Sequence, residues 1–225
     1  MNKNNIDEKK KSVTHSTKKE TATLKSRIAE LDKKLETASG KKLEPYKFSG
    51  IVYLLIDCSL SMKEGNKMSQ AKNGAAGFAD EAIRRGYSIG LIKFAGYATH
   101  ILEPQNELAR LKDSIERIGF DGGTNITDAI KMATDRLKDE RREKVMCIVT
   151  DGNPYPPDCK ENALDAAYEA RSKGIDIMTI GTDDADKDFL RLIASRSDFV
   201  VSVKRTQLAE GIASAAKLLH QGTKQ

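Results

Sequence analysis

The chain has 225 residues, of which 39% are hydrophobic and 32% charged, a composition typical of one soluble globular domain with additional polar sequence. No apolar run approaches the ~18 residues of a membrane span, and residues 1–11 lack the apolar core of a signal peptide, so we expect a cytoplasmic protein that does not bind membranes. The odd number and wide spacing of Cys58, Cys147 and Cys159 argue against a disulfide framework or a Cys-x-x-Cys metal site.

The formal net charge of +5 resides in the first part of the chain. Residues 1–44 contain 12 Lys and Arg against 7 Asp and Glu, whereas residues 45–225 contain 26 of each. We therefore divide the chain into a Lys-rich extension (1–44) and a folded domain (45–225). An amphipathic helix is predicted at about 21–38 from four apolar residues at helical spacing. They are Leu24, Ile28, Leu31 and Leu35. Because the extension has no aromatic residue for stacking on bases, we expect no nucleic-acid partner.

The rest of the chain alternates short apolar runs with longer stretches of helical period, which predicts an α/β fold around a largely parallel sheet. The predicted strands are 50–57, 87–95, 98–103, 145–151, 175–181 and 198–203. The predicted helices are 67–85, 106–118, 127–142, 161–173, 186–196 and 206–219. Several strands are apolar on both faces, as expected when helices cover both sides of the sheet.

Three segments with polar side chains lie at the ends of predicted strands or in a loop between predicted elements. Residues 57–61 read Asp-Cys-Ser-Leu-Ser after the first strand, residues 122–125 read Gly-Gly-Thr-Asn, and residues 150–152 read Thr-Asp-Gly at the end of the fourth strand. In open α/β sheets ligands bind beyond the carboxyl ends of the strands, so we expect the three segments to converge there.

The donors in these segments form an all-oxygen set without His or Cys. The predicted ligands are Asp57, Ser59, Ser61, Thr124 and Asp151. Hard divalent cations prefer such a set, and its small number of carboxylates favours Mg²⁺, with Mn²⁺ and Ca²⁺ as alternatives. Because neutral hydroxyl ligands leave much of the metal's charge uncompensated, we expect an Asp or Glu of a partner protein to complete the coordination shell.

The order and positions of these three segments resemble those of the von Willebrand factor A (VWA) family over about residues 48–220. The resemblance implies a Rossmann-like sheet of six strands in the order 3-2-1-4-5-6, with the strand at 98–103 antiparallel at one edge. It also implies a metal-ion-dependent adhesion site. In the family the two serines of the first segment bind the metal directly, and the two Asp residues bind partly through water. The threonine joins when a partner's acidic residue binds. Stand-alone cytoplasmic bacterial members, which act as adaptors, resemble this chain best.

Two other functions are compatible with the same residues. A Mg²⁺ site with a leading Asp is also found in aspartyl-phosphate phosphatases, but these place a second Asp as general acid where this chain has Ser59, and we therefore expect no enzyme. The acidic stretch 183–188 is better explained as a turn and a helix N-cap than as further metal ligands. Alternatively, the chain is a structural subunit of a larger complex, held by its N-terminal helix, which could also mediate self-association.

Overall fold

The computed structural model of the protein describes residues 50–152, 154 and 159–220. The chain divides into two units, Met1–Tyr46 and Lys47–Gln225, and every described residue belongs to the second. The predicted extension (1–44) and the helix predicted at 21–38 lie outside the described residues and stay predictions. Within the described part of the chain, no helix is both long and apolar enough to cross a membrane.

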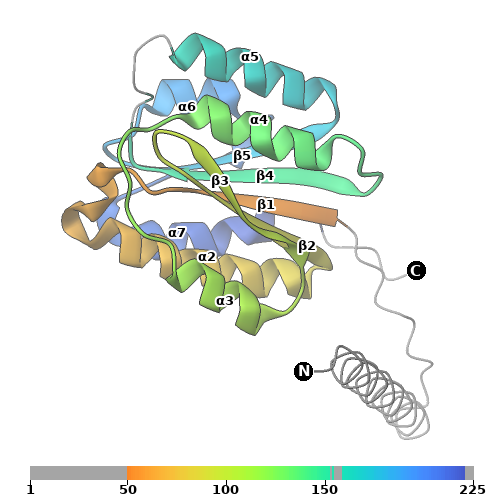
Figure 1. Ribbon diagram of the computed structural model, residues 1–225, viewed down its shortest axis with the longest axis horizontal. Helices are drawn as coiled ribbons and strands as arrows, with labels where there is room; N and C mark the ends of the chain where they lie inside the picture. The colour runs from red at the N-terminus through yellow and green to blue at the C-terminus, as the bar shows by residue number, and fades with distance from the viewer. Residues whose placement is uncertain (1–49, 153, 155–158, 221–225) are drawn as a thin grey trace, which may run out of the picture. The chain divides into compact units, whose positions relative to one another are not determined.

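A six-stranded sheet in the order β3-β2-β1-β4-β5-β6 forms the centre of the domain (Figure 1). The strands are β1 (Gly50–Asp57), β2 (Tyr87–Phe94), β3 (Ala98–Gln105), β4 (Glu143–Thr150), β5 (Ile175–Thr182) and β6 (Val200–Val203). All neighbouring pairs are parallel except β2 with β3, which is antiparallel at the edge. Both the fold class and the strand order expected from the sequence are confirmed.

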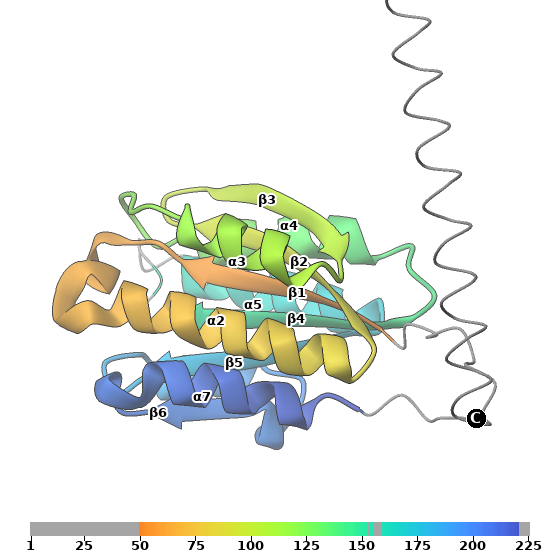
Figure 2. The ribbon, with the colours of Figure 1, turned by 90° about the horizontal axis from the view of Figure 1, so that it is seen from below.

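Helices cover both faces of the sheet. They are α2 (Lys67–Arg84), α3 (Leu108–Glu116), α4 (Ile126–Leu137), α5 (Cys159–Ser172), α6 (Lys187–Ile193) and α7 (Leu208–Ala215). Figures 1 and 2 show α2, α3 and α7 on one face, with α2 and α7 side by side, and α4, α5 and α6 on the other.

The central strand β1 is buried along its whole length because it contributes to the cores on both faces. Leu54 belongs to the core that contains Phe78 of α2, whereas the next residue, Leu55, belongs to the core that contains Ile130 of α4. This alternation explains why β1 reads as a continuous apolar run. It also fixes the carboxyl end of β1 in the middle of the sheet, between the ends of β2 and β4.

Several predicted elements have different bounds in the structure. The strand predicted at 198–203 begins at Val200 after the 3₁₀ segment η2 (Ser197–Phe199), and the helix predicted at 186–196 ends at Ile193. The helix predicted at 206–219 is divided among η3 (Arg205–Gln207), α7 and η4 (Ala216–Leu218).

Two further differences are larger. The helix predicted at 127–142 ends at Leu137, because the five residues from Lys138 to Arg142 are all charged and offer no apolar side chain to the core. The 3₁₀ segment η1 (Leu60–Asn66) is not predicted. It bends through Gly65 and Asn66, whose φ angles of 57° and 63° lie in the left-handed region, and it leads directly into α2.

Candidate metal centre

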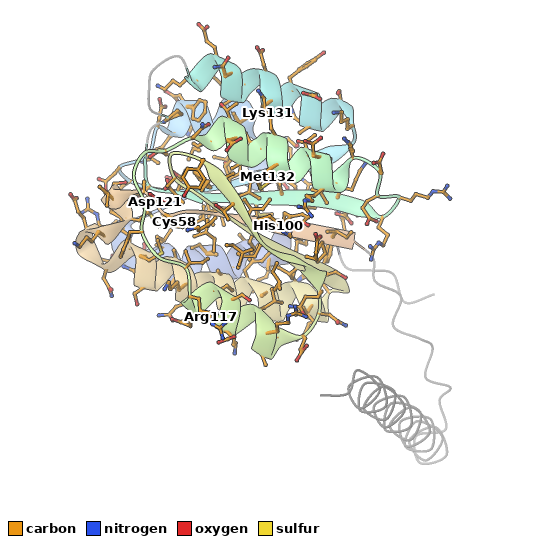
Figure 3. All side chains as sticks on the ribbon, viewed as in Figure 1. Cys58, His100, Arg117, Asp121, Lys131 and Met132 are labelled. Atoms are coloured by element: carbon orange, nitrogen blue, oxygen red, sulfur yellow. The ribbon has the colours of Figure 1, made fainter. Side chains whose placement is uncertain are left out.

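The five predicted ligands come from three loops at one edge of the sheet. Asp57 is the last residue of β1, Asp151 follows β4, and Thr124 lies two residues before α4. Since β1 and β4 are neighbouring parallel strands, with Ile56 opposite Val149, their carboxyl ends lie side by side. The third loop is attached to the same edge, because the amide of Asp121 donates to the carbonyl of Cys58 over 2.8 Å. Figure 3 labels these two residues, which lie next to each other.

Hydrogen bonds join the serine hydroxyls to one of the carboxylates. The hydroxyls of Ser59 and Ser61 lie 3.0 Å apart, and Ser61 Oγ donates to Asp151 Oδ1 over 2.9 Å. Gly152 lies close to both Ser61 and Thr124. A methyl group at Gly152 would lie 3.7 Å from Thr124 Oγ1 and 3.8 Å from Ser61 Oγ. The absence of a side chain at this glycine therefore leaves open the space between the two hydroxyls.

The carboxylate of Asp57 is fully buried and held by two hydrogen bonds. Thr150 Oγ1 donates to its Oδ2 over 2.5 Å, and the amide of Ser59 donates to its Oδ1 over 2.8 Å. Burial raises the pKa of Asp57 to about 6, although both hydrogen bonds oppose the shift. A bound cation would remove this cost of burial, so the site favours a positive charge next to Asp57.

The carboxylate of Asp151 has a cationic partner that was not predicted. Its Oδ2 accepts a hydrogen bond from Lys67 Nζ, which also lies 3.3 Å from Asp184 Oδ2. Desolvation lowers the pKa of Lys67, but the two carboxylates outweigh that effect and the net shift is upward. The sequence carries a signal for this residue, because Lys67 falls on the same helix face as Ala71, which is buried in the core.

The arrangement fits a hard divalent cation. All the converging donors are oxygens, Asp57 and Asp151 are buried, and Gly152 leaves room between the hydroxyls. No group of three or more His, Cys, Asp and Glu side chains suited to a metal occurs among the described residues, so a shell here would depend on hydroxyl ligands. The structure thus brings together Ser59, Ser61 and Asp151 by direct contact and places Asp57 and Thr124 beside them.

The acidic stretch 183–188 forms a helix N-cap and ion pairs, and one of its residues, Asp184, lies beside Lys67 at the site. Asp186 is the N-cap of α6, where its side chain accepts from the amide of Phe189, and it also pairs with Lys160. Asp184 pairs with Arg205. The turn and N-cap predicted for this stretch are therefore present.

Cys58 stands among the site residues but takes no part in the cluster. Its side chain is buried in the core on the α2 face, and its thiol donates to the carbonyl of Ile56 over 3.3 Å. Burial raises the pKa of this thiol to about 12. A buried, protonated thiol is inert.

Large apolar side chains are exposed on the loops around the site. Leu60, Tyr97 and Phe120 have exposed fractions of 63%, 60% and 45%. Tyr97 lies in the β2–β3 turn, which is tied to the glycine loop by the bond from the amide of Gly96 to the carbonyl of Gly122. Phe120 also lines a pocket of about 290 Å³ between η1, α2 and the end of α3.

Comparison with known sequences points to one family. The sequence model of the von Willebrand factor type A domain matches residues 52–215. The UPF0353 protein of Mycobacterium ulcerans is 31% identical over 146 residues, which cover 58% of this chain and 43% of that protein. The UPF0353 protein of Mycolicibacterium paratuberculosis is 30% identical with the same coverage. The chain spans less than half the length of these curated relatives.

Solved structures share the fold at low sequence identity. The vWF domain of the type V pili tip protein Mfa5 from Porphyromonas gingivalis matches with a TM-score of 0.71 and 14% identity, over 80% of this chain and 99% of that chain. Proximal thread matrix protein 1 from the mussel byssus, in a structure with a zinc occupied MIDAS motif, matches with a TM-score of 0.65 and 22% identity. That match covers 77% of this chain and 46% of the mussel chain.

Proposed function

Because the chain belongs to the von Willebrand factor type A domain family, we propose that it is a non-enzymatic interaction protein that captures an Asp or Glu side chain of a partner protein at a Mg²⁺ site. Domains of this family generally mediate protein–protein interactions and commonly bind a divalent metal. The observation that carries the proposal is the convergence of five oxygen-bearing side chains from three loops on one sheet edge.

The proposed ligands have distinct parts in the site. Ser59 and Ser61 would hold the metal with neutral hydroxyls, and Asp57 and Asp151 with charged carboxylates. Thr124, whose hydroxyl lies near Gly152, would supply a further oxygen. When bound, Mg²⁺ supplies a positive charge that attracts a carboxylate. Asp57 and Asp151 balance the charge of the metal. The positive charges of Lys67 and Arg205 exceed the single negative charge of Asp184, so the cluster keeps a net preference for an anion.

The surroundings of the site support a protein partner rather than a free anion. The exposed Leu60, Tyr97 and Phe120 would be covered by the partner's own apolar side chains, as in the desolvated centres of protein interfaces. We therefore propose a partner segment in which an acidic residue stands next to apolar residues. Burial of apolar surface around the acidic residue would supply binding affinity, and the metal would supply specificity for the carboxylate.

The proposal of a non-enzymatic role rests on Ser59. An aspartyl-phosphate mechanism initiated by Asp57 needs a general acid near the nucleophile, and a serine hydroxyl does not donate a proton readily at neutral pH. A cytoplasmic location also belongs to the proposal and is tested by cell fractionation with an antibody against the chain.

The proposal is tested by affinity capture with the tagged full chain, quantified by mass spectrometry. Recovery of specific partners is expected to disappear in EDTA, to return with excess Mg²⁺, and to be lost in the double variant Asp57→Ala with Ser59→Ala. The matched control is Asp135→Ala with Ser172→Ala, which changes the same residue types at exposed positions outside the metal-site loops. Equal recovery of the same partners by all three proteins would refute the proposal.

Two further measurements address the alternatives. Hydrolysis of an aryl phosphate that depends on Mg²⁺ and disappears in Asp57→Asn would favour a phosphatase. Deletion of residues 1–44 tests the structural-subunit alternative, in which the deletion dissolves the complex while the double variant at the metal site preserves it. We expect the opposite: the chain without residues 1–44 should keep its partners, and the double variant at the metal site should lose them.

A further inference from the structure

Lys67 is the one lysine among the described residues that is buried, with 2% of its surface exposed. Its ammonium group pairs with Asp151, whose side chain has no exposed surface. A buried charge without a partner is strongly unfavourable, so each of these two groups needs the other whenever no other ion is near. The pair links the first turn of α2 to the loop after β4, across 84 residues of sequence.

The pair divides the two oxygens of the Asp151 carboxylate between different partners. Oδ2 accepts from Lys67, and Oδ1 accepts from Ser61 Oγ, which belongs to the proposed ligand set. Lys67 thereby occupies one carboxylate oxygen, and the contact with Ser61 of the proposed ligand set is made by the other. A divalent cation bound to Asp151 would therefore share this carboxylate with the positive charge of Lys67.

We propose that Lys67 is the resident counter-ion of Asp151, which stabilises the protein when it holds no metal and keeps the affinity for the divalent cation low. This inference rests on the metal site of the proposed function, but not on the binding of a partner. A unit charge and a divalent ion a few ångströms apart repel each other enough, even when water screens them well, to weaken binding by about tenfold.

Asp184 makes this arrangement reversible. Its carboxylate lies 3.3 Å from Lys67 Nζ and is 40% exposed, so it is a second partner close to the first. When a bound metal attracts the carboxylate of Asp151, the ammonium group of Lys67 still has the carboxylate of Asp184 as its partner. Asp184 is held in place by Arg205, whose Nη2 lies 2.6 Å from the same oxygen.

The test is isothermal titration of the metal-free full chain with Mn²⁺ and with Mg²⁺, together with thermal unfolding. Lys67→Met keeps the length of the side chain and removes its charge. We expect this variant to bind Mn²⁺ about tenfold more tightly than the wild type, to have a lower Tm without metal, and to gain more in Tm when Mn²⁺ is added. The control is Lys144→Met, a half-buried lysine that donates to the carbonyl of Lys173 and touches no predicted ligand. Its metal affinity should equal that of the wild type.

Asp184→Asn tests the inference from the opposite direction and at a surface position that tolerates substitution. Without Asp184 the ammonium group depends on Asp151 alone, so Mn²⁺ affinity should fall. Asp188→Asn, which makes the same charge change on the exposed side of α6, should not lower it. In the Lys67→Met background, Asp184→Asn should have little effect. Unchanged or weaker Mn²⁺ binding by Lys67→Met, or equal affinities for the two Asp→Asn variants, would overturn the inference.

The outcomes also separate this inference from the proposed function. If wild type and Lys67→Met bind Mn²⁺ with equal affinity, the metal site stands and the role of Lys67 is refuted. If neither binds Mn²⁺ or Mg²⁺ while both are folded, the metal site of the proposed function fails and the inference fails with it. If Lys67→Met binds Mn²⁺ and the wild type does not, the inference that Lys67 lowers the affinity for the metal is supported.

Discussion

Thr150 Oγ1 donates a hydrogen bond to Asp57 Oδ2 over 2.5 Å, so the last residue of β4 holds the carboxylate at the end of β1. Both residues are buried. The same hydroxyl accepts a hydrogen bond from the amide of Gly152 over 3.2 Å, which ties the third loop of the site to the first. Thr150 is therefore a support for a ligand rather than a ligand, and its effect can be measured separately.

Replacement of Thr150 by valine keeps the shape of the side chain and removes the hydroxyl. Because outer groups that orient a metal ligand contribute strongly to affinity, we expect Thr150→Val to bind Mg²⁺ about tenfold more weakly in calorimetric titration. The control is Thr134→Val, since Thr134 is also buried and donates to the carbonyl of Ile130, within α4. Both variants should lose about 1 kcal/mol of stability, and only Thr150→Val should lose metal affinity. Equal Mg²⁺ affinities would contradict this role.

The raised pKa of Asp57 makes the stability of the metal-free protein depend on pH. Its pKa rises from 3.8 to about 6 on folding, mainly because burial disfavours the charged form. The protonated carboxyl group stabilises the fold fully below pH 3.8, and this contribution disappears as the pH rises through about 6. Metal-free wild type should therefore lose about 3 kcal/mol, relative to Asp57→Asn, between pH 3.8 and pH 7.

The pH effect is checked by urea denaturation in EDTA at several pH values between 3.8 and 7. In saturating Mg²⁺ the decline of wild-type stability towards pH 7 should disappear, because the cation compensates the charge of Asp57. Parallel pH profiles for wild type and Asp57→Asn without metal would show that the carboxyl group carries no such cost.

Gly152→Ala is expected to weaken metal binding without unfolding the protein. The added methyl group would lie at ordinary contact distances of 3.7 Å from Thr124 Oγ1 and 3.8 Å from Ser61 Oγ, so it fits the fold but occupies the space between two ligands. In Gly181→Ala, by contrast, the methyl group would overlap the side chain of Leu190 in the core. Thermal unfolding and Mn²⁺ titration should show a loss of affinity in the first variant and a loss of stability in the second. If Gly152→Ala binds Mn²⁺ as tightly as the wild type, the metal does not occupy the space next to Gly152.

Gly90→Ala should destabilise the sheet, because Gly90 lies opposite Tyr53 in the β1–β2 pair and an added methyl group would overlap the tyrosine ring. Overpacking of this kind costs about 1–3 kcal/mol. The loss is measured as a lower urea midpoint at constant slope. Gly119→Ala is the control, since nothing lies within 4 Å of a methyl group there. Similar midpoints for the two variants would mean that the ring moves aside freely.

Local patterns in the sequence were sufficient to predict an α/β fold around a largely parallel sheet, whereas the strand order was predicted from the resemblance to the VWA family. The residues of β1 are apolar at every position from Ile51 to Ile56, which is typical of a strand covered on both faces, and the predicted bounds of this strand agree with the structure. The types of the five proposed ligands, and their positions after strands and in a glycine loop, were also readable, because the topology of a parallel sheet brings such positions to one edge.

The tertiary structure alone decided which charges meet at the site. The pairing of Lys67 with Asp151 joins residues 84 positions apart, and Asp184 and Arg205 reach the same cluster from other loops. A periodic pattern shows that Lys67 faces the core, but the identity of its partner depends on how η1 bends through Gly65 and Asn66 before α2 begins. Sequence periodicity reports the face of an element, whereas an ion pair between distant loops depends on the relative placement of whole elements, which only the packed fold establishes.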